Sequence, residues 1–140
     1  MDAEILEGHW CLESFYVEQA GGQRVYPFGP DAVGYLTYWQ GRFQANLMAR
    51  GRRPFASGDL ANPAPDEAVA AFRQYIGYTG RYVFDGRQVS HTVEVASFPD
   101  WVGGTQTRLV TWQDNRLVLT TPPLAYGRAT PVFTLVWQRV

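Results

Sequence analysis

Apolar and polar residues alternate along most of this 140-residue chain, the period-two pattern typical of half-buried β-strands. The clearest run is Val89-x-His91-x-Val93-x-Val95, in which one imidazole stands in a row of valines. Since successive side chains of a strand point to opposite faces, His91 is expected on the valine side of the sheet. The same pattern predicts strands over residues 8–18, 33–39, 42–50, 78–84, 89–95, 105–112, 117–121 and 132–139.

One segment has the period of a helix. Val69, Phe72 and Ile76 recur at helical spacing, and Pro65 is followed by two acidic residues that favour a helix amino terminus. The pattern predicts one helix over residues 65–76, between the third and fourth strands.

The lengths of the connections predict how the strands are arranged. Two-residue turns at 40–41, 85–86 and 114–115 alternate with connections that are all long. Eight antiparallel strands in this order indicate an all-β, up-and-down barrel that forms a single domain over residues 1–140. Alternate connections of such a barrel lie at the same end, so the long ones should meet at an open mouth with the helix as its lid. Eight strands leave room for packed side chains or for one small ligand.

The tight turns also predict which residues look inward. With a two-residue turn after residue 84, Gly80 lies opposite His91 and leaves free space above it. The turn at 114–115 pairs Arg108 with Thr121 on the inner wall, nearer the mouth. Tyr38 is an inner-wall residue by the same reasoning, and a one-residue slip would invert each of these directions.

Composition and charge exclude several classes of function. The net charge of −1 gives no electrostatic case for nucleic acid or an anionic membrane. No apolar run approaches the ~20 residues of a spanning helix, and the acidic amino terminus predicts no secretory signal. Cys11 is alone, and His9 and His91 fit no metal-ligand spacing. We therefore expect a cytoplasmic protein without a metal or another cofactor.

Two inward ionisable side chains carry the candidate chemistry. His91 has two readings. It acts as a general acid or base, or it is a neutral core histidine whose ring hydrogen-bonds to a tyrosine or to water. Arg108 needs an anion nearby, because an unpaired buried cation is costly. The anion could belong to a ligand, as a carboxylate, enolate or phenolate. Alternatively, it is a carboxylate of the protein at the mouth, namely Asp100, Asp59 or Glu94. By its parity, Glu94 belongs to the outer face or the rim.

Aromatic and polar residues complete the predicted site. Tyr78 is expected near the mouth as a third catalytic group with a phenol hydroxyl, and Tyr82 in the core. Trp101, on a loop rich in proline and glycine, is expected at the rim. For the tyrosines, plain core packing with hydroxyls that reach water stays open. The expected ligand-binding residues share an inner-wall or rim position; they are Tyr16, Tyr38, Tyr75, Phe98, Trp101, Gln106 and Thr121. Tyr16 is placed there because it should share a face with Trp10.

The stretch Gly8-His9-Trp10 resembles the G-x-W motif of lipocalins, and Arg139 in the last strand is the arginine that this resemblance requires. It implies that Trp10 closes the narrow end of the barrel and that Arg139 packs across it, both as structural residues. More of the chain is similar to the short lipocalin-like domain family of bacteria and fungi, in GHWCLESF, YPFGPDAVGYLTY, RRPFASGD, AAFRQYIGYTGRY, VSHTVEVASFPDWVGG and LTTPP. The resemblance implies a ligand-holding barrel, and some members resemble components of natural-product pathways.

Three hypotheses of function follow. In the first, the barrel binds a small hydrophobic, oxygenated, polyketide-like molecule and catalyses its cofactor-free isomerisation, cyclisation or dehydration. His91 would move the proton, and Arg108 or a tyrosine would steady the oxyanion. In the second, the protein only binds or carries such a molecule. In the third, the aromatic mouth binds another protein. A titratable group deep in the barrel favours the first, because a carrier can work with an apolar cavity.

Overall fold

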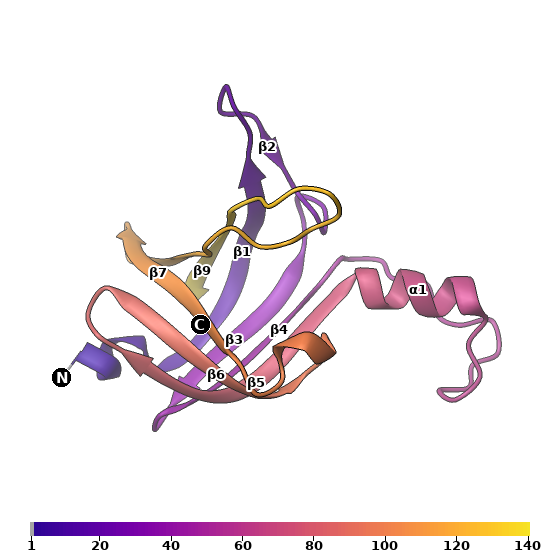
Figure 1. Cartoon of the computed structure of the whole chain (residues 1–140), viewed down its shortest axis with the longest axis horizontal. Coiled ribbons are helices and arrows are strands. Elements are labelled where there is room, and N and C mark those ends of the chain that lie inside the picture. The colour runs from indigo at the N-terminus through magenta and orange to yellow at the C-terminus, as the bar shows by residue number, and fades with distance from the viewer. Residues whose placement is uncertain (1) are drawn as a thin grey trace.

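The computed structural model describes the backbone of residues 2–140 and the side chains of residues 4–140. Within these residues one antiparallel sheet closes on itself, because β1 pairs with β3 on one side and with β9 on the other (Figure 1). The elements are η1 (Asp2–Leu6), β1 (Gly8–Glu18), β2 (Arg24–Val25), β3 (Val33–Trp39), β4 (Arg42–Met48), α1 (Pro65–Arg73), β5 (Tyr75–Phe84), β6 (Gln88–Ala96), η2 (Pro99–Trp101), β7 (Thr105–Gln113), β8 (Arg116–Thr120) and β9 (Phe133–Arg139). Apart from β2, a two-residue strand beside the far end of β1, these strands form the predicted eight-stranded all-β barrel.

The two ends of the barrel differ as the connection lengths predict. Tight connections join β3 to β4, β5 to β6 and β7 to β8, whereas α1, η2 and the other long connections lie at the opposite end, the mouth. Two tight turns have left-handed backbones, Gln40-Gly41 with φ of 48° and 79° and Asp114-Asn115 with φ of 50° and 69°. These values suit the two-residue hairpin turns whose twist matches that of the strands.

The β5–β6 hairpin differs from its predicted register by two residues. The Asp85 carboxylate accepts the backbone N–H groups of Arg87 and Gln88 at 2.9 and 2.7 Å, which makes the connection longer than a two-residue turn. His91 consequently lies opposite Tyr82, and the expected pairing with Gly80 is wrong. A shift by two keeps every side chain on its face, so His91 still looks inward.

A β-bulge in β6 explains why residue 80 is a glycine. Gly80 pairs with Val93 and Thr79 with Val95, so Glu94 is the extra residue of β6. A Cβ atom on Gly80 would stand 1.9 Å from the carbonyl oxygen of Thr92. The glycine therefore allows a close approach of two backbones, and the expected free space above it is absent.

The helix is shorter than predicted and does not cover the mouth. α1 ends at Arg73, because Tyr75 and Ile76 join β5 and pair with Met48 and Leu47 of β4. The third barrel strand likewise ends at Met48, two residues before its predicted end. Hydrogen bonding to β4 thus places Ile76 in a strand, although its spacing from Val69 and Phe72 is that of a helix.

α1 extends away from the barrel, joined to it through the start of β5 (Figure 1). None of its residues is buried, so the expectation that it forms the lid is wrong. No helix in the described chain has both the length and the apolar character needed to cross a membrane.

Two groups of buried side chains fill the barrel. The base cluster, at the tight-turn end, surrounds Trp10, Tyr38, Phe43 and Trp137, and His91 is buried among its residues. The mouth cluster surrounds Phe15 and includes side chains from the long connections. His91 therefore lies among the aromatic side chains of the base cluster.

At the base, Trp10 is fully buried and its indole N–H donates to the carbonyl of Leu6 at 3.0 Å. The guanidinium of Arg139 lies 4.0 Å from the centre of the indole ring and donates to the carbonyls of Glu7 and Ile5. This is the arginine-over-tryptophan contact that the G-x-W resemblance implies, and it closes the narrow end beneath η1.

Candidate functional site

His91 lies on the inner wall of β6 with 1% of its surface exposed. The ring of Phe43 stacks on its imidazole at 4.2 Å between centroids. The hydroxyl of Tyr38 lies 2.7 Å from Nε2, and the hydroxyl of Tyr78 lies 3.4 Å from Nδ1. Both ring nitrogens thus face tyrosine hydroxyls, which matches the neutral, hydrogen-bonded reading of a buried histidine and leaves proton transfer open.

The order of the strands brings these side chains together. Tyr38 and Phe43 are paired neighbours on either side of the β3–β4 turn, and Phe43 pairs with Gly80 on β5. Tyr82 lies next to His91 across β5 and β6, and its ring packs against that of Tyr38 at 4.6 Å. The site is built from adjacent strands and not from loops, so its geometry is fixed by the sheet.

Arg108 is the buried charge of the site. It lies on β7 with 4% of its surface exposed, and it donates to the carbonyl of its neighbour Thr107 at 2.9 Å. Within the described chain, none of the ion pairs involves Arg108. The mouth carboxylates expected as partners do not reach it, since Asp59 and Asp100 are exposed.

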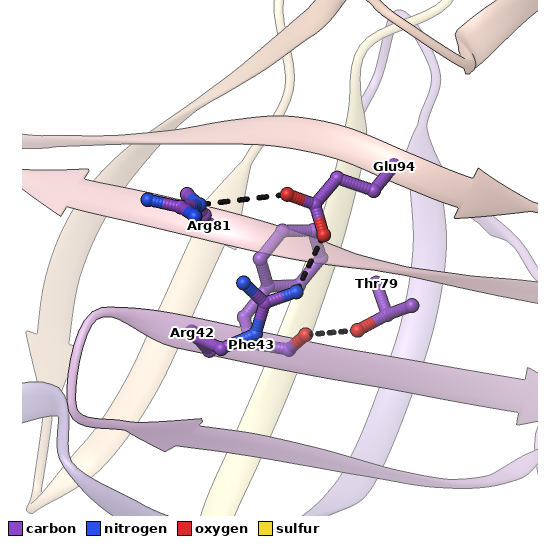
Figure 2. Close-up of polar contacts among 5 residues, drawn as sticks. All are labelled: Arg42, Phe43, Thr79, Arg81 and Glu94. Atoms are coloured by element: carbon purple, nitrogen blue, oxygen red, sulfur yellow. Dashed lines mark hydrogen bonds and ion pairs between the residues drawn. The ribbon is translucent and has the colours of Figure 1, made fainter.

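Glu94, the third expected partner, lies on the outer face between two other cations. Its carboxylate forms ion pairs with Arg42 and Arg81 from β4 and β5 (Figure 2). Alternation from His91 through Val93 places Glu94 on the outer face, as its parity predicted, and the bulge turns Val95 outward beside it. Arg108 is therefore left without a carboxylate.

Burial determines the protonation states around Arg108. The pKa of His91 lies well below its ordinary value, because burial disfavours the imidazolium and the Arg108 cation repels it. Burial, and then the nearby Tyr78, raise the pKa of Tyr38 well above that of a free phenol, against the opposing effect of Arg108. At neutral pH the imidazole and the phenol are both uncharged, so Arg108 supplies the positive charge.

The mouth side of the site is aromatic. The ring of Tyr78 lies 5.1 Å from that of Trp101 in η2, and Phe98 packs on the other side of Trp101 at 5.7 Å. Trp101 is only partly buried and contacts the base cluster. Tyr78 and Trp101 therefore lie between His91 and the solvent at the mouth.

Two further expected residues lie on the inner wall. Gln106 of β7 is the direct cross-strand partner of His91. Thr121 is buried, and its hydroxyl accepts the backbone N–H of Phe133 at 3.0 Å, so one of its lone pairs is already used.

Tyr16 does not reach this site. The register of β1 against β9 shifts between Leu12 and Ser14, and this bulge reverses the alternation beyond it. Phe15 takes the inner position, and Tyr16 packs instead with Val118 and Val136 in a separate cluster. The expectation that Tyr16 shares a face with Trp10 is wrong for this reason.

Tyr75 is also outside the barrel. Its hydroxyl donates to the side-chain oxygen of Asn46, and the guanidinium of Arg52 lies 5.6 Å from its ring. Tyr75 pairs with Met48 at the start of β5, where it has the opposite parity to Tyr78. Its predicted position on the inner wall or rim is therefore wrong.

Sequence reasoning did not name two inner side chains as residues of the site. Phe43 is the ring that stacks on His91, and the alternation of Phe43, Ala45 and Leu47 would have placed it inside. Trp137 is 1% exposed in the base cluster, and its indole N–H has no hydrogen-bond partner among the described residues. No sequence signal indicates that unpaired donor.

Metal chemistry has no obvious ligands in the described chain, where no group of three or more His, Cys, Asp or Glu side chains converges. Two open hollows lie on the outer face of the sheet. One, of about 510 Å³, is lined by residues that include Trp39 and Arg42 and also Tyr38 and Phe43, and the other is lined by residues that include Tyr75 and Tyr78. Neither is lined by His91 or Arg108.

Comparison with known proteins gives three findings. Residues 7–140 match the lipocalin-like domain family. The 4′-hydroxy-3′-methoxypropiophenone carrier protein of Aspergillus oryzae is 29% identical over 105 residues, which cover 69% of this chain and 95% of that protein. A crystal structure of a lipocalin-like protein from Bacteroides uniformis superposes with a TM-score of 0.47 at 16% identity, covering 96% of this chain and 98% of that chain.

Proposed function

Because the chain belongs to the lipocalin-like domain family, we propose that its barrel binds a small, apolar, oxygenated molecule beside Arg108 and His91. The observation that carries this proposal is the unpaired charge of Arg108. A guanidinium at 4% exposure without a carboxylate is costly unless an anion or a strong acceptor completes it. A phenolate, enolate or carboxylate oxygen of the ligand would do so.

The rings around His91 support an aromatic ligand. Phe43 and Tyr38 stack on the imidazole, whereas Tyr78 meets it edge-on and in turn meets Trp101 edge-on. The relative from Aspergillus oryzae is named for carrying an aryl ketone with a phenol group. A ligand of that class, polyketide-like or otherwise, offers both a ring for these faces and oxygen acceptors for Arg108.

A second candidate function is cofactor-free catalysis on the same ligand. It is favoured by the pair of hydrogen bonds that hold a neutral imidazole deep in the barrel, since binding alone does not need a titratable group there. In this function His91 moves a proton to or from a carbon beside a carbonyl group, and Arg108 stabilises the oxyanion that forms. The outcome is an isomerisation, cyclisation or dehydration.

The experiment uses 4′-hydroxy-3′-methoxypropiophenone as the probe. Titration calorimetry measures its affinity for the wild type, for Arg108→Met and for the control Arg81→Met, whose guanidinium is on the outer face. We expect Arg108→Met to weaken binding at least tenfold, the size of one hydrogen bond to a charged group, and Arg81→Met to leave it unchanged. Equal affinity of the wild type and Arg108→Met would contradict the proposed site.

Deuterium exchange separates the two candidate functions. The protons on the carbon beside the ketone exchange slowly in D₂O, and NMR follows their loss with and without the protein. A carrier binds the probe without accelerating the exchange. A catalyst accelerates it, and His91→Gln then removes the acceleration while the probe still binds.

A further inference from the structure

The hydroxyl of Tyr38, the imidazole of His91 and the hydroxyl of Tyr78 form a continuous line from the base cluster toward the mouth. A neutral imidazole has one N–H donor and one acceptor nitrogen, so such a line can be polarised in only one of two directions. Which direction holds determines whether a ligand meets a donor or an acceptor.

The buried end of the line fixes the direction. Tyr38 is fully buried, and Nε2 of His91 at 2.7 Å is the one hydrogen-bond partner that the described chain gives its hydroxyl. The raised pKa of Tyr38 keeps its proton in place. Arg108, the nearby charged group, has only donors and cannot take that proton. Tyr38 therefore donates to Nε2, and the proton of the imidazole is on Nδ1.

The other end of the line then points outward. The Nδ1–H group faces the hydroxyl oxygen of Tyr78 at 3.4 Å, a long contact that occupies the acceptor side of that oxygen. The hydroxyl proton of Tyr78 must be directed elsewhere. The ring of Tyr78 contacts both His91 and Trp101, and since Trp101 belongs to the mouth, we infer that the hydroxyl proton is directed to the mouth side of the interior.

We propose that Tyr78, and not His91, hydrogen-bonds the ligand alongside Arg108, and that the site selects ligands through a carbonyl or phenolate oxygen acceptor. This inference rests on the proposed function and assigns the ligand class of the same site. His91 is then a positioning residue whose Nδ1–H sets the direction of the Tyr78 hydroxyl.

The surplus of donors in the barrel supports this assignment. Arg108 has five N–H groups and makes one described hydrogen bond, and the buried indole N–H of Trp137 has no described partner. In the proposed site, Arg108 and the Tyr78 hydroxyl would offer protons to a ligand. A ligand that presented only donors would leave them unsatisfied at a cost.

The tautomer of His91 is measured first, without any ligand. Long-range ¹H–¹⁵N NMR distinguishes a protonated ring nitrogen from an unprotonated one, and the variant His9→Asn removes the signals of the other histidine. We expect Nδ1 protonated and Nε2 unprotonated in the wild type, and in Tyr38→Phe a loss of this single tautomer. A wild-type imidazole protonated at Nε2 would overturn the proposal.

Binding then tests the role of Tyr78, with propiophenone and propylbenzene as probes that differ in one carbonyl oxygen. We expect the wild type to bind propiophenone about tenfold more tightly. Tyr78→Phe should reduce that preference at least fivefold without affecting propylbenzene, whereas Tyr75→Phe, the matched outer-face control, should keep it. An unchanged preference in Tyr78→Phe would overturn the proposal. Failure of both probes to bind would contradict the proposed function. The NMR measurement of the His91 tautomer would still show which way the hydrogen bonds from Tyr38 to Tyr78 run.

Discussion

Replacing Arg108 by methionine should make the ligand-free protein more stable, although it removes a native hydrogen bond. Methionine has a similar length, no charge and no hydrogen-bonding requirement. Relief of an unpaired buried cation is worth about 2–4 kcal/mol, whereas the lost bond to the Thr107 carbonyl costs about 1.5 kcal/mol. The expected net gain in the free energy of unfolding is about 0.5–2.5 kcal/mol. For a chain of this size that corresponds to a rise in Tm of roughly 2–9 °C.

Urea unfolding and differential scanning calorimetry on the ligand-free protein measure this gain. Arg81→Met is the matched control, because its side chain is 72% exposed and its pairing with Glu94 lies in solvent, so the change should stay within about 0.5 kcal/mol. The pKa of His91, followed by NMR, should rise in Arg108→Met because one source of its depression is gone, yet stay below its ordinary value because burial remains the larger cause. If Arg108→Met destabilises the protein by more than about 1 kcal/mol, Arg108 is a structural residue and the reasoning for a ligand fails.

Three further predictions concern stability. The pKa of His91 is lower in the folded protein than in the unfolded chain, so the unfolded chain takes up the proton first as the pH falls. The free energy of unfolding should therefore be constant above pH 6.5 and fall by up to about 1.4 kcal/mol per pH unit below it. Urea unfolding of His91→Gln over the same pH range should lack that slope. Arg139→Ala should lower the free energy of unfolding, measured with urea, by about 1–2 kcal/mol, because it removes the stacked guanidinium and its two hydrogen bonds to carbonyls. Arg139→Lys should recover less than half of this loss. Full recovery by lysine would show that the charge alone matters. Gly80→Ala should lower the free energy of unfolding by about 2–3 kcal/mol, because its Cβ atom would meet the Thr92 carbonyl. Gly104→Ala is the control and should be tolerated, since the nearest atom to its Cβ would be 3.6 Å away. Equal effects of the two changes in thermal unfolding would contradict the role of the bulge.

The barrel and its two ends were predictable because they depend on repeated, local signals. Alternation identifies a strand from its own residues, and the difference between tight and long connections sorts the ends without knowledge of any contact. The inward direction of His91 survived a wrong register, since an error of two residues preserves the face, and the register that placed Arg108 was predicted correctly.

The errors come from irregularities that alternation cannot reveal. A bulge after Leu12 turns Tyr16 out of the barrel, and pairing of Ile76 with β4 ends the helix early, which leaves Tyr75 on the outer face. A bulge or a ladder is stabilised by neighbouring strands, so its cause lies far away in the sequence. A hydrogen bond from His91 to a tyrosine was one of the predicted alternatives, but its two partners, Tyr38 and Tyr78, lie on other strands and could not be singled out.

The central claim is that a small oxygenated aromatic ligand binds inside the barrel beside His91 and Arg108. Intermolecular NOEs between propiophenone and the isotope-labelled protein test it most directly, because they identify the protein rings within about 5 Å of the bound probe. We predict NOEs from the propiophenone ring to Tyr78 and Trp101, and their loss in Arg108→Met under the same probe concentration. NOEs confined to Trp39, in the hollow on the outer face, would contradict the claim.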